Sequence, residues 1–392
     1  MRKIKVLHII TRLILGGAQE NTLLTIEGLQ KTDRYDVRLL TGPLEGPEDD
    51  LLAFCREHEI HYTVFSQLQM EINPFKDLIT LFELYFFLRK NKFDIVHTHS
   101  AKTGIIGRLA AKMAGVPIRV HTIHGLPFHP YQSEYLNQLQ IALEKSVAGI
   151  TDLILCVAKA MIDKSVQAGI AGREKFYLVR SGFPVDPYLY AKKDEGLARR
   201  LGIEPEDVVI GKVARLYDLK GHKYLISAFR EVLKKIPSAR LLLVGDGILR
   251  DALTAQAEEL GVLSRVIFAG EVPNSEIQRY IALMDLLVHA SLREGLAKIL
   301  PQALLMGKPV VSFDIDGASE IIVDHTTGLL TPPENVEALI DALIFMMENK
   351  AEASMMAIRG RKLALSLFPV ERMVNQIDEL YLHLLNAKAI HI

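Results

Sequence analysis

The sequence contains few cysteines, and their positions exclude a scaffold held together by disulfide bonds. Cys55 and Cys156 are the two cysteines among 392 residues, and neither belongs to a C-x-x-C pattern or to a cysteine–histidine pattern with metal-ligand spacing. A disulfide framework or a structural zinc site needs sulfur atoms at shorter, repeated spacings. We therefore expect a protein of a reducing compartment, the cytoplasm.

The sequence also lacks a strong charge of either sign. The formal net charge is -1, with 49% hydrophobic and 24% charged residues. A chain so close to neutral lacks the electrostatic footprint of a nucleic-acid binder, and we expect no nucleic acid as a partner. The composition is typical of a globular protein, and the length fits two or three domains.

Long apolar runs are missing as well. The longest candidate, residues 77–92, carries Glu83 within it, so no run is long enough to span a bilayer. The N-terminal stretch 1–19 resembles a signal peptide, but Arg12 interrupts its apolar part. We interpret residues 4–10 as a buried strand and expect at most a peripheral contact with a membrane.

Short β-rich apolar runs alternate with longer amphipathic stretches along most of the chain. In the first half, strands are predicted over 3–10, 36–40, 94–99, 118–123, 153–157 and 175–180, and helices over 18–31, 104–114 and 135–149. In the second half, strands are predicted over 208–214, 239–247, 265–270, 286–290 and 309–313, and helices over 221–235, 334–348, 352–366 and 370–387. This alternation indicates parallel sheets with helices on both faces.

The composition changes between the two halves. Residues 181–207 are rich in proline, glycine and charge, which predicts a linker with a short helix inside it. We therefore predict an α/β protein of two doubly wound, Rossmann-like domains, residues 1–185 and 186–369. Ligands of open parallel sheets bind beyond the C-terminal ends of the strands, so a cleft between two facing sheets is the expected site.

Gly16 and Gly17 lie between the first predicted strand and the first predicted helix. Glycines there permit close backbone approach, and the free N–H groups of a helix N-terminus attract anions. The full G-x-G-x-x-G fingerprint is absent, which argues against a dinucleotide-dependent dehydrogenase. A tight strand-to-helix turn without a ligand is the alternative interpretation.

Five histidines gather within residues 97–129: His97, His99, His121, His124 and His129. No cysteine or carboxylate joins them at ligand spacing, so a metal site is not favoured. We interpret His97 and His129 as groups that cap strand ends. His124 follows a predicted strand and is better placed to point into a cleft as a hydrogen-bonding group.

Arg215 ends the first predicted strand of the second half, and Lys220 lies just before the next helix. Two cations at the C-terminal end of a strand suit a diphosphate, because arginine binds two oxygens at once and lysine adds a mobile charge. Exposed basic residues are common, and a solvated surface is the alternative.

The stretch "SLREGLAKILPQAL" (291–304) carries a second set of candidate binding groups. Proline is tolerated in the first turn of a helix, so Pro301 predicts a helix that begins near residues 297–300. Glu294 then lies in the preceding loop, Gln302 lies in or just past the first turn, and the N–H groups of 295–298 can meet an anion. The alternative is that Glu294 merely stabilises the helix N-terminus.

The pair Asp314 and Asp316 matches an Asp-x-Asp pattern by which many sugar transferases hold a divalent cation. Such pairs arise often by chance, and Glu320 is the one further carboxylate nearby. We do not expect a metal here.

Taken in order, "LGGAQ", "VHTIHG", "ARLYDLKG", "LLLVGDG", "SLREG" and "GKPVVSFDIDGASEII" form a known series. The chain resembles the retaining glycosyltransferases of the GT-B fold, specifically the fourth sequence family. The resemblance covers nearly the whole chain, and its C-terminal half is the more specific part. The stretch 97–117 is also similar to members found in bacterial exopolysaccharide and lipid-linked glycan assembly.

The resemblance implies transfer of a sugar from a nucleotide-sugar donor with retained anomeric configuration and without a metal or other cofactor. UDP-sugars are the first expectation and GDP-mannose the second, with a glycan, a lipid-linked molecule or a small molecule as acceptor. No pair of flanking carboxylates is evident in the sequence, so the two-carboxylate scheme of hydrolases gains no support. We favour front-face attack, with the phosphate itself taking the acceptor proton. The resemblance also implies that the last helix, 370–392, returns to the N-terminal domain.

The resemblance also assigns roles to residues. Arg215 and Lys220 would neutralise the leaving diphosphate, and Glu294 would hydrogen-bond the donor sugar. His124 would join Arg215, Lys220 and Glu294 as a catalytic residue, across the cleft near the donor sugar. The remaining donor contacts that the resemblance implies are Gly16, Gly17, Val272, Gly295, Leu296, Ala297, Lys298 and Gln302, with Val272 at the base and Gln302 at the ribose.

Two positions depart from the family pattern, which usually has glutamate where this chain has Gln302 and proline where it has Ala297. An amide can bond a ribose diol as a carboxylate does, so we still expect an active enzyme. The alternatives are a nucleotide-sugar epimerase of the same fold and a non-catalytic nucleotide-sugar-binding protein. Residues 75–88 are more typical of a helix that packs on the sheet than of a membrane contact. Followed by Arg89, Lys90 and Lys92, they would also suit the inner face of a membrane or a lipid-linked acceptor.

Overall fold

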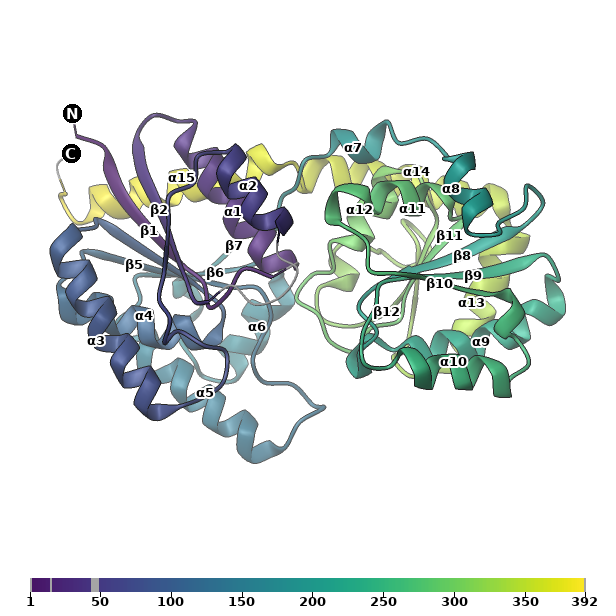
Figure 1. Ribbon diagram of the computed structural model, residues 1–392, viewed down its shortest axis with the longest axis horizontal. Coiled ribbons are helices and arrows are strands. Elements are labelled where there is room, and N and C mark those ends of the chain that lie inside the picture. Colours follow the sequence, from purple (N-terminus) through teal and green to yellow (C-terminus); the bar gives the residue numbers. More distant parts are fainter. Residues whose placement is uncertain (1, 15, 44–48, 391–392) are drawn as a thin grey trace. The chain divides into compact units, whose positions relative to one another are not determined.

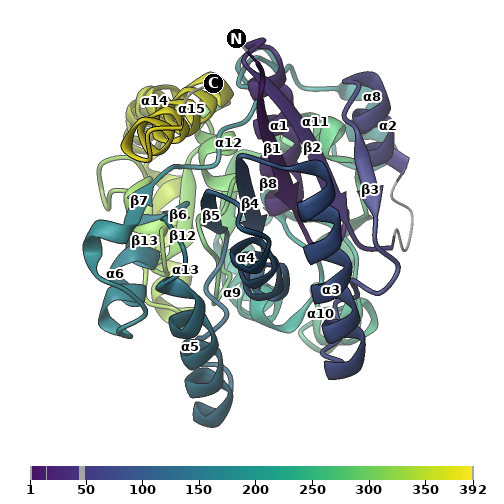
Figure 2. The same ribbon diagram turned by 90° about the vertical axis from the view of Figure 1, so that its left-hand side faces the viewer.

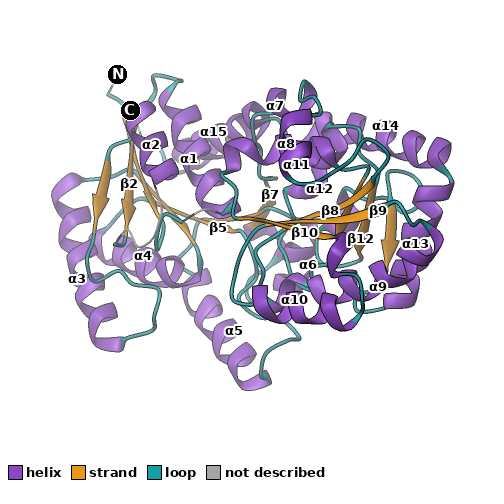
Figure 3. Ribbon diagram, turned by 45° about the vertical axis from the view of Figure 1, so that its right-hand side comes forward, coloured by secondary structure: helices purple, strands orange, loops and turns teal. Residues whose placement is uncertain are grey.

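A computed structural model describes residues 2–14, 16–43 and 49–390 of the chain. The chain divides into two compact units, Met1–Phe183 together with Pro369–Ile392, and Pro184–Phe368. Each unit is a parallel sheet covered by helices on both faces (Figures 1 and 3), so the predicted α/β class with two Rossmann-like sheets is confirmed.

The first unit contains a seven-stranded sheet with the order β3-β2-β1-β4-β5-β6-β7. Its strands are β1 (Ile4–Ile9), β2 (Tyr35–Thr41), β3 (Tyr62–Val64), β4 (Ile95–His99), β5 (Ile118–Ile123), β6 (Leu153–Cys156) and β7 (Phe176–Leu178). Its helices are α1 (Gly17–Gln30), α2 (Asp49–Glu57), α3 (Pro74–Asn91), α4 (Ala101–Ala114), α5 (Glu134–Ala148), α6 (Lys159–Gln167) and α15 (Val370–Ala387).

The two faces of this sheet carry different helices. Helices α1, α2 and α15 lie on one face, and α3, α4 and α5 lie on the other, with α4 between its two neighbours (Figures 1 and 2). The order reverses at β1 and β4, because the chain leaves β1 toward β2 on one side and leaves β4 toward β5 on the other. Near-continuous apolar strands, buried on both faces, are what such a sheet requires.

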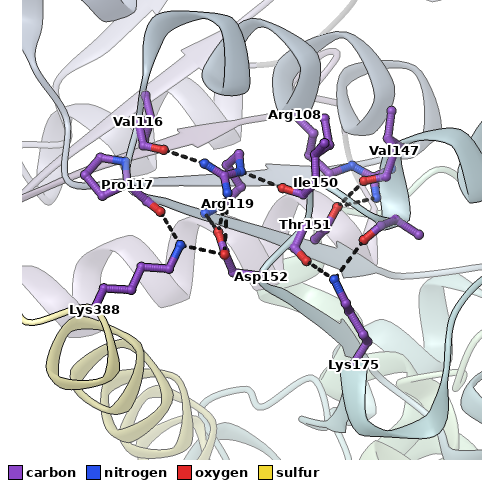
Figure 4. A network of polar contacts seen from close by, with 11 residues as sticks. Arg108, Val116, Pro117, Arg119, Val147, Ile150, Thr151, Asp152, Lys175 and Lys388 are labelled. Atoms are coloured by element: carbon purple, nitrogen blue, oxygen red, sulfur yellow. Dashed lines mark hydrogen bonds and ion pairs between the residues drawn. The ribbon is translucent and has the colours of Figure 1, made fainter.

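Helix α15 belongs to this first unit although it lies at the end of the chain, and it packs on α1. Tyr381 is fully buried, and Asp378 accepts hydrogen bonds from Tyr35 and Arg34. At the far end, Lys388 donates to Asp152 and to the carbonyl of Pro117, both at 2.6 Å (Figure 4). Polar contacts therefore fix the middle of α15 and its C-terminal end. Residues 391 and 392 of the helix predicted over 370–392 lie outside the described residues.

The second unit contains a six-stranded sheet with the order β10-β9-β8-β11-β12-β13. Its strands are β8 (Val208–Val213), β9 (Ala239–Val244), β10 (Val266–Gly270), β11 (Leu286–His289), β12 (Val310–Phe313) and β13 (Leu329–Thr331). Its helices are α7 (Asp186–Leu189), α8 (Glu195–Arg200), α9 (His222–Lys235), α10 (Arg250–Glu259), α11 (Ile277–Leu283), α12 (Ile299–Leu305), α13 (Val336–Glu348) and α14 (Lys350–Leu367).

The predicted linker, 181–207, differs from the expectation. It contains two short helices, α7 and α8, where one was predicted, and Tyr188 of α7 is buried against the second unit. The short strands β3 and β13 and the helix α6 were not predicted at all. Across the described residues, no helix combines the length and apolarity needed to cross a membrane.

Candidate functional site

The predicted cations and the predicted carboxylate come together at one end of the second sheet. Strands β8 and β11 are neighbours, and the chain leaves them toward opposite sides of the sheet. Arg215 and Lys220 lie in the loop after β8, and Glu294 lies in the loop after β11. This reversal of strand order is where open α/β sheets leave a crevice for a ligand.

The loop after β8 is held against the end of β11 by a glycine. Gly221 has a positive φ of 67°, and a Cβ there would lie 1.8 Å from the carbonyl oxygen of Ala290. The backbone N–H of Leu292 also donates to the carbonyl of Leu219, at 2.8 Å. Only glycine combines this conformation with such a close approach. Gly221 therefore permits the contact between the two loops and immediately precedes α9.

Lys220 and Glu294 form an ion pair between these loops, in which Nζ donates to Oε1. His289, at the end of β11, places Nε2 3.8 Å from the same oxygen. Burial raises the pKa of Glu294, but the charge of Lys220 and the approach of His289 outweigh it and hold the pKa well below the ordinary value of 4.5. Glu294 is therefore a carboxylate at any physiological pH.

The backbone around Glu294 is held in place by the loop that follows β12. Its N–H donates to Oδ2 of Asp316 at 2.8 Å, and the N–H of Gly317 donates to the carbonyl of Gly295 at 3.1 Å. One aspartate of the Asp-x-Asp pair thus has a structural role in this loop. Residues 295–298 lead into α12, which begins at Ile299 within the predicted range, and Leu296 among them is buried.

Gln302 lies in the first turn and a half of α12 and is 8% exposed. Its amide nitrogen donates to the hydroxyl of Tyr188 at 2.7 Å. The side chain is therefore oriented by α7, a contact that the sequence did not predict. Val272, the position predicted at the base, is buried in the loop after β10.

Arg215 is exposed, and its guanidinium lies 5.2 Å from the centre of the Tyr217 ring. A cation over an aromatic face is weakly stabilised, and an exposed guanidinium can donate hydrogen bonds to a ligand. The exposed guanidinium and the partly buried Lys220 thus present two cations at the end of β8.

The predicted residues of the first unit also lie at the reversal of its sheet. Gly16 precedes and Gly17 begins α1, after β1, and the hydroxyl groups of Thr11 and Ser100 meet at 2.8 Å across the ends of β1 and β4. His124 follows β5, and its Nε2 lies 3.0 Å from Nδ1 of His99. Nδ1 of His8 lies 2.9 Å from Nε2 of His99, so a chain of three imidazoles runs from β1 to His124.

The histidine predictions need two corrections. His97 does not cap a strand end: it lies in the middle of β4, fully buried, and contacts the hydroxyls of Tyr381 and Thr122. His129 lies in the loop before α5, where its N–H donates to Asn137 and its Nδ1 accepts from the N–H of Tyr131. Both histidines make contacts within the first unit, and these contacts cannot be predicted from where the strands end.

Nitrogens of His8, His97 and His99 lie within 4.8 Å of one another, close enough to share a metal ion. Binding one would require hydrogen bonds to be given up, since His97 and His99 already use both ring nitrogens. Burial, followed by the neighbouring histidines, holds the pKa values of His97 and His99 far below 6.5, and burial lowers the pKa of His8 to about 3. The described cluster is therefore a neutral hydrogen-bonded group.

Sequence reasoning missed several buried polar groups around Lys220. Lys212 of β8, His222 of α9, His289 of β11 and Ser291 are all buried. Lys212 lies within the strand predicted over 208–214, and a lysine inside "VVIGKVA" is unusual for a strand buried on both faces. This lysine was the feature of the sequence from which a buried polar group in that strand could have been predicted.

Two family models match the chain. The model described as "Glycosyltransferase Family 4" matches residues 15–186, and that described as "Glycosyl transferases group 1" matches residues 194–363. Together they cover both units.

The chain belongs to glycosyltransferase family 4.

Curated bacterial enzymes match along most of the chain. One is the UDP-Gal:alpha-D-GlcNAc-diphosphoundecaprenol alpha-1,3-galactosyltransferase of Escherichia coli, 27% identical over 387 residues, with 97% of each chain covered. Another is the N-acetyl-alpha-D-glucosaminyl L-malate synthase of Bacillus anthracis, 24% identical over 360 residues, with 90% of this chain and 91% of the other covered. The chain is thus similar to glycosyltransferases of bacterial glycan assembly.

Solved structures of glycosyltransferases share the fold. HepE from Anabaena, in complex with UDP and glucose, has a TM-score of 0.81 at 24% identity, and 96% of this chain and 99% of that chain are covered. Sucrose-phosphate synthase from Thermosynechococcus elongatus has a TM-score of 0.81 at 20% identity, with 98% and 100% covered. At such identities the likeness establishes the GT-B fold of this glycosyltransferase.

Proposed function

We propose that this glycosyltransferase moves a hexose from a UDP-sugar to a lipid-linked acceptor, with retention of anomeric configuration and without a metal cofactor. The names of the relatives support the donor and the acceptor. The Escherichia coli relative uses UDP-galactose and a sugar-diphosphoundecaprenol, and HepE binds UDP and glucose. GDP-mannose is the second donor candidate, and a free glycan or small molecule the second kind of acceptor.

The observation that carries the proposal is the arrangement of Arg215, Lys220 and Glu294 at the ends of β8 and β11. Cleavage of a glycosyl–phosphate bond places negative charge on the leaving diphosphate and positive charge on the sugar. Fixed cations beside the diphosphate stabilise the first charge, and such preorganised electrostatics usually contribute most to catalysis. Arg215 and Lys220 supply these cations, so protein side chains perform the neutralisation.

Glu294 then serves the donor sugar. Because it is ionised and paired with Lys220, it cannot deliver a proton, and it acts as a hydrogen-bond acceptor for sugar hydroxyl groups. The acceptor attacks from the face of the departing diphosphate, whose oxygen takes the acceptor proton. A trapped covalent glycosyl adduct on any side chain would contradict this step.

The remaining predicted positions also have proposed roles toward the substrates. Gln302, oriented by Tyr188, bonds the ribose hydroxyls, and Val272 lies at the base. The backbone N–H groups of the loop 295–298 meet phosphate or sugar oxygens. Gly16, Gly17 and His124 of the first unit serve the donor sugar, its phosphate and the acceptor.

A membrane contact through α3 fits a lipid-linked acceptor. Phe75, Leu78, Phe82 and Phe86 are 73%, 51%, 46% and 65% exposed, and their spacing places them on one face of the helix. Arg89, Lys90 and Lys92 follow and are exposed. Apolar side chains beside a cluster of cations are what an anionic bilayer surface binds.

Figure 2 shows α3 along the outer edge of the first unit, beside α4. We place the enzyme in the cytoplasm, at the inner face of the membrane, where the buried thiols of Cys55 and Cys156 stay reduced.

A panel of UDP-, GDP- and ADP-sugars in a thermal shift assay tests the donor. A ligand at 100 times its dissociation constant adds about 2.7 kcal/mol of stability. We expect stabilisation by UDP-sugars. Stabilisation by none of them would reject the proposal.

Two further assays separate the rival functions. Conversion of the sugar nucleotide to its epimer without any acceptor would identify an epimerase. Binding with neither transfer nor slow donor hydrolysis would identify a non-catalytic binding protein.

A further inference from the structure

Lys212 is a buried amine without a partner. It is the fifth residue of β8, its side chain is 0% exposed, and its Nζ has no hydrogen-bond partner among the described residues. Lysine is almost never fully buried unless it is paired, because an ammonium group loses its hydration there. A lysine retained in this situation points to a partner that binds from outside the chain.

The surroundings of Lys212 identify the chemistry of that partner. Lys220 lowers its pKa and Glu294 raises it, so both lie within electrostatic reach, and Lys212 in turn lowers the pKa values of His222 and His289. These groups face it from the β8 loop, the β11 loop, α9 and β11. Two lysines, two imidazoles and one carboxylate thus interact in this region, and the carboxylate is already paired with Lys220.

The N-terminus of α9 adds a further preference for an anion. This helix begins at His222, has 14 residues and has no side chain capping its first turn. Free N–H groups and the helix dipole favour a bound anion at such an end. The unpartnered amine and the uncapped helix are independent observations that favour the same kind of ligand.

We propose that Lys212 is a third cation of the diphosphate site, and that it takes up a proton when the diphosphate of the donor binds. The inference rests on the proposed function, since the diphosphate is that of the sugar nucleotide. The sequence patterns that marked Arg215 and Lys220 did not mark Lys212, because it lies within the strand and not in the loop.

The protonation of Lys212 without ligand makes the proposal measurable. Burial, and then the charge of Lys220, lower the pKa of Lys212 from 10.5 to about 7. A diphosphate beside it favours the ammonium form and raises that pKa again. Between pH 7 and the higher value, donor binding therefore includes uptake of a proton, and affinity falls as pH rises.

Calorimetric titration of the full chain with UDP-galactose measures the proton uptake on binding. The titration is done at pH 6 and at pH 8, each in two buffers of different ionisation enthalpy. With a free pKa of about 7, we expect uptake of about 0.1 proton at pH 6 and about 0.9 at pH 8. The two phosphates of a sugar nucleotide do not titrate in this range. Absence of proton uptake at pH 8 would overturn the proposal. Proton uptake that is larger at pH 6 than at pH 8 would also overturn it, because that result would assign the proton to a histidine.

The variant Lys212→Met removes the amine and keeps the length of the side chain. We expect it to weaken UDP-galactose binding by about 10- to 100-fold and to abolish the uptake at pH 8. Lys308→Met is the matched control, because Lys308 is a half-buried lysine of the second unit that has a partner: its Nζ donates to the carbonyl of Ala282 at 3.0 Å. It should leave both quantities unchanged.

The outcomes separate the inference from the proposed function. If the unmodified protein does not bind UDP-galactose, the proposed function fails. If it binds, and a folded Lys212→Met variant has the same affinity and the same uptake, the inference alone fails. Lys212→Gln gives a second, polar variant in which the same loss of uptake is expected.

Discussion

Lys220 and Glu294 are paired across the ends of two adjacent strands, and this pair joins the groups proposed for the diphosphate to the group proposed for the sugar. Without ligand, the cation of Lys220 is shared with a protein carboxylate. When the diphosphate binds, Lys220 can serve both anions from the same position. The pair therefore keeps both side chains oriented before the donor arrives, which is the preorganisation that catalysis by fixed charges requires.

Replacement of Glu294 tests its assignment to the sugar. We expect Glu294→Ala to lower kcat by about 100-fold, because an oriented polar contact that strengthens in the transition state is lost. The donor KM should change little. Steady-state transfer kinetics give both values, and a raised KM with an unchanged kcat would assign Glu294 to ground-state binding.

Replacement of Gln302 tests the ribose contact. We expect Gln302→Ala to raise the donor KM by about tenfold, the value of one or two hydrogen bonds, with kcat nearly unchanged. Gln302→Glu should retain affinity, since a carboxylate can accept from the Tyr188 hydroxyl and from a ribose. Small and equal effects of Gln302→Ala and Glu294→Ala would place the site elsewhere.

Tyr188→Phe distinguishes the proposed contact of Gln302 with the ribose from the hydrogen bond that orients Gln302. The variant keeps the ring and removes the hydroxyl that accepts from Gln302. We expect a smaller rise in donor KM than for Gln302→Ala, because the amide remains but is less firmly oriented. A larger rise would show that Tyr188 itself contacts the donor.

Lys212 should also affect stability in a pH-dependent way. Its pKa is about 7 in the folded protein and near 10.5 in the unfolded chain, so the unfolded chain binds more protons between these values. The destabilising effect of Lys212 is therefore greatest at and below pH 7 and decreases as pH rises toward 10.5. We expect Lys212→Met to stabilise the free protein by about 1–3 kcal/mol at pH 7, with a smaller gain at pH 9.5.

Thermal melting of the two proteins at both pH values measures this difference. A variant that is less stable than the unmodified protein at pH 7, or a gain that does not shrink at pH 9.5, would contradict the buried, unpartnered state of the amine. Stabilisation together with weaker donor binding is the signature expected of a functional group kept at a cost to folding.

The exposed face of α3 predicts a salt-sensitive association with anionic vesicles. We expect Phe82→Ser combined with Phe86→Ser to reduce the partition coefficient by at least about tenfold, because each buried phenyl ring contributes about 1.5–3 kcal/mol. Flotation with phosphatidylglycerol-containing liposomes measures it. Ile248→Ser is the control, as Ile248 is 74% exposed in the second unit. A protein that stays entirely in solution would remove the membrane contact.

The alternation of strands and helices could be predicted from the sequence. Buried parallel strands are apolar throughout and amphipathic helices repeat every few residues, and both patterns are visible within a short stretch of chain. The same reasoning located α12, since Pro301 restricts where a helix can begin. These signals depend on neighbours along the chain. The strands β3 and β13, with three residues each, were not recognised, whereas the equally short β7 lies inside the β-rich stretch 175–180.

The parts of the site that escaped prediction depend on contacts between distant segments. Gln302 and Tyr188 are 114 positions apart, and His97 and Tyr381 are 284 apart. Lys212 was hidden for a different reason: a strand pattern averages over its residues, and one lysine among apolar neighbours does not change the assignment. Local periodicity therefore predicts elements, while the partners of individual side chains need the fold.

One measurement tests the central claim most directly. The full chain is incubated with UDP-galactose and an N-acetylglucosamine-diphosphoundecaprenol acceptor in the presence of EDTA, and the anomeric configuration of any product is determined by NMR. We expect a galactosylated lipid with the configuration of the donor, and about 100-fold slower formation by Glu294→Ala. An inverted product, or equal rates for both proteins, would contradict the account.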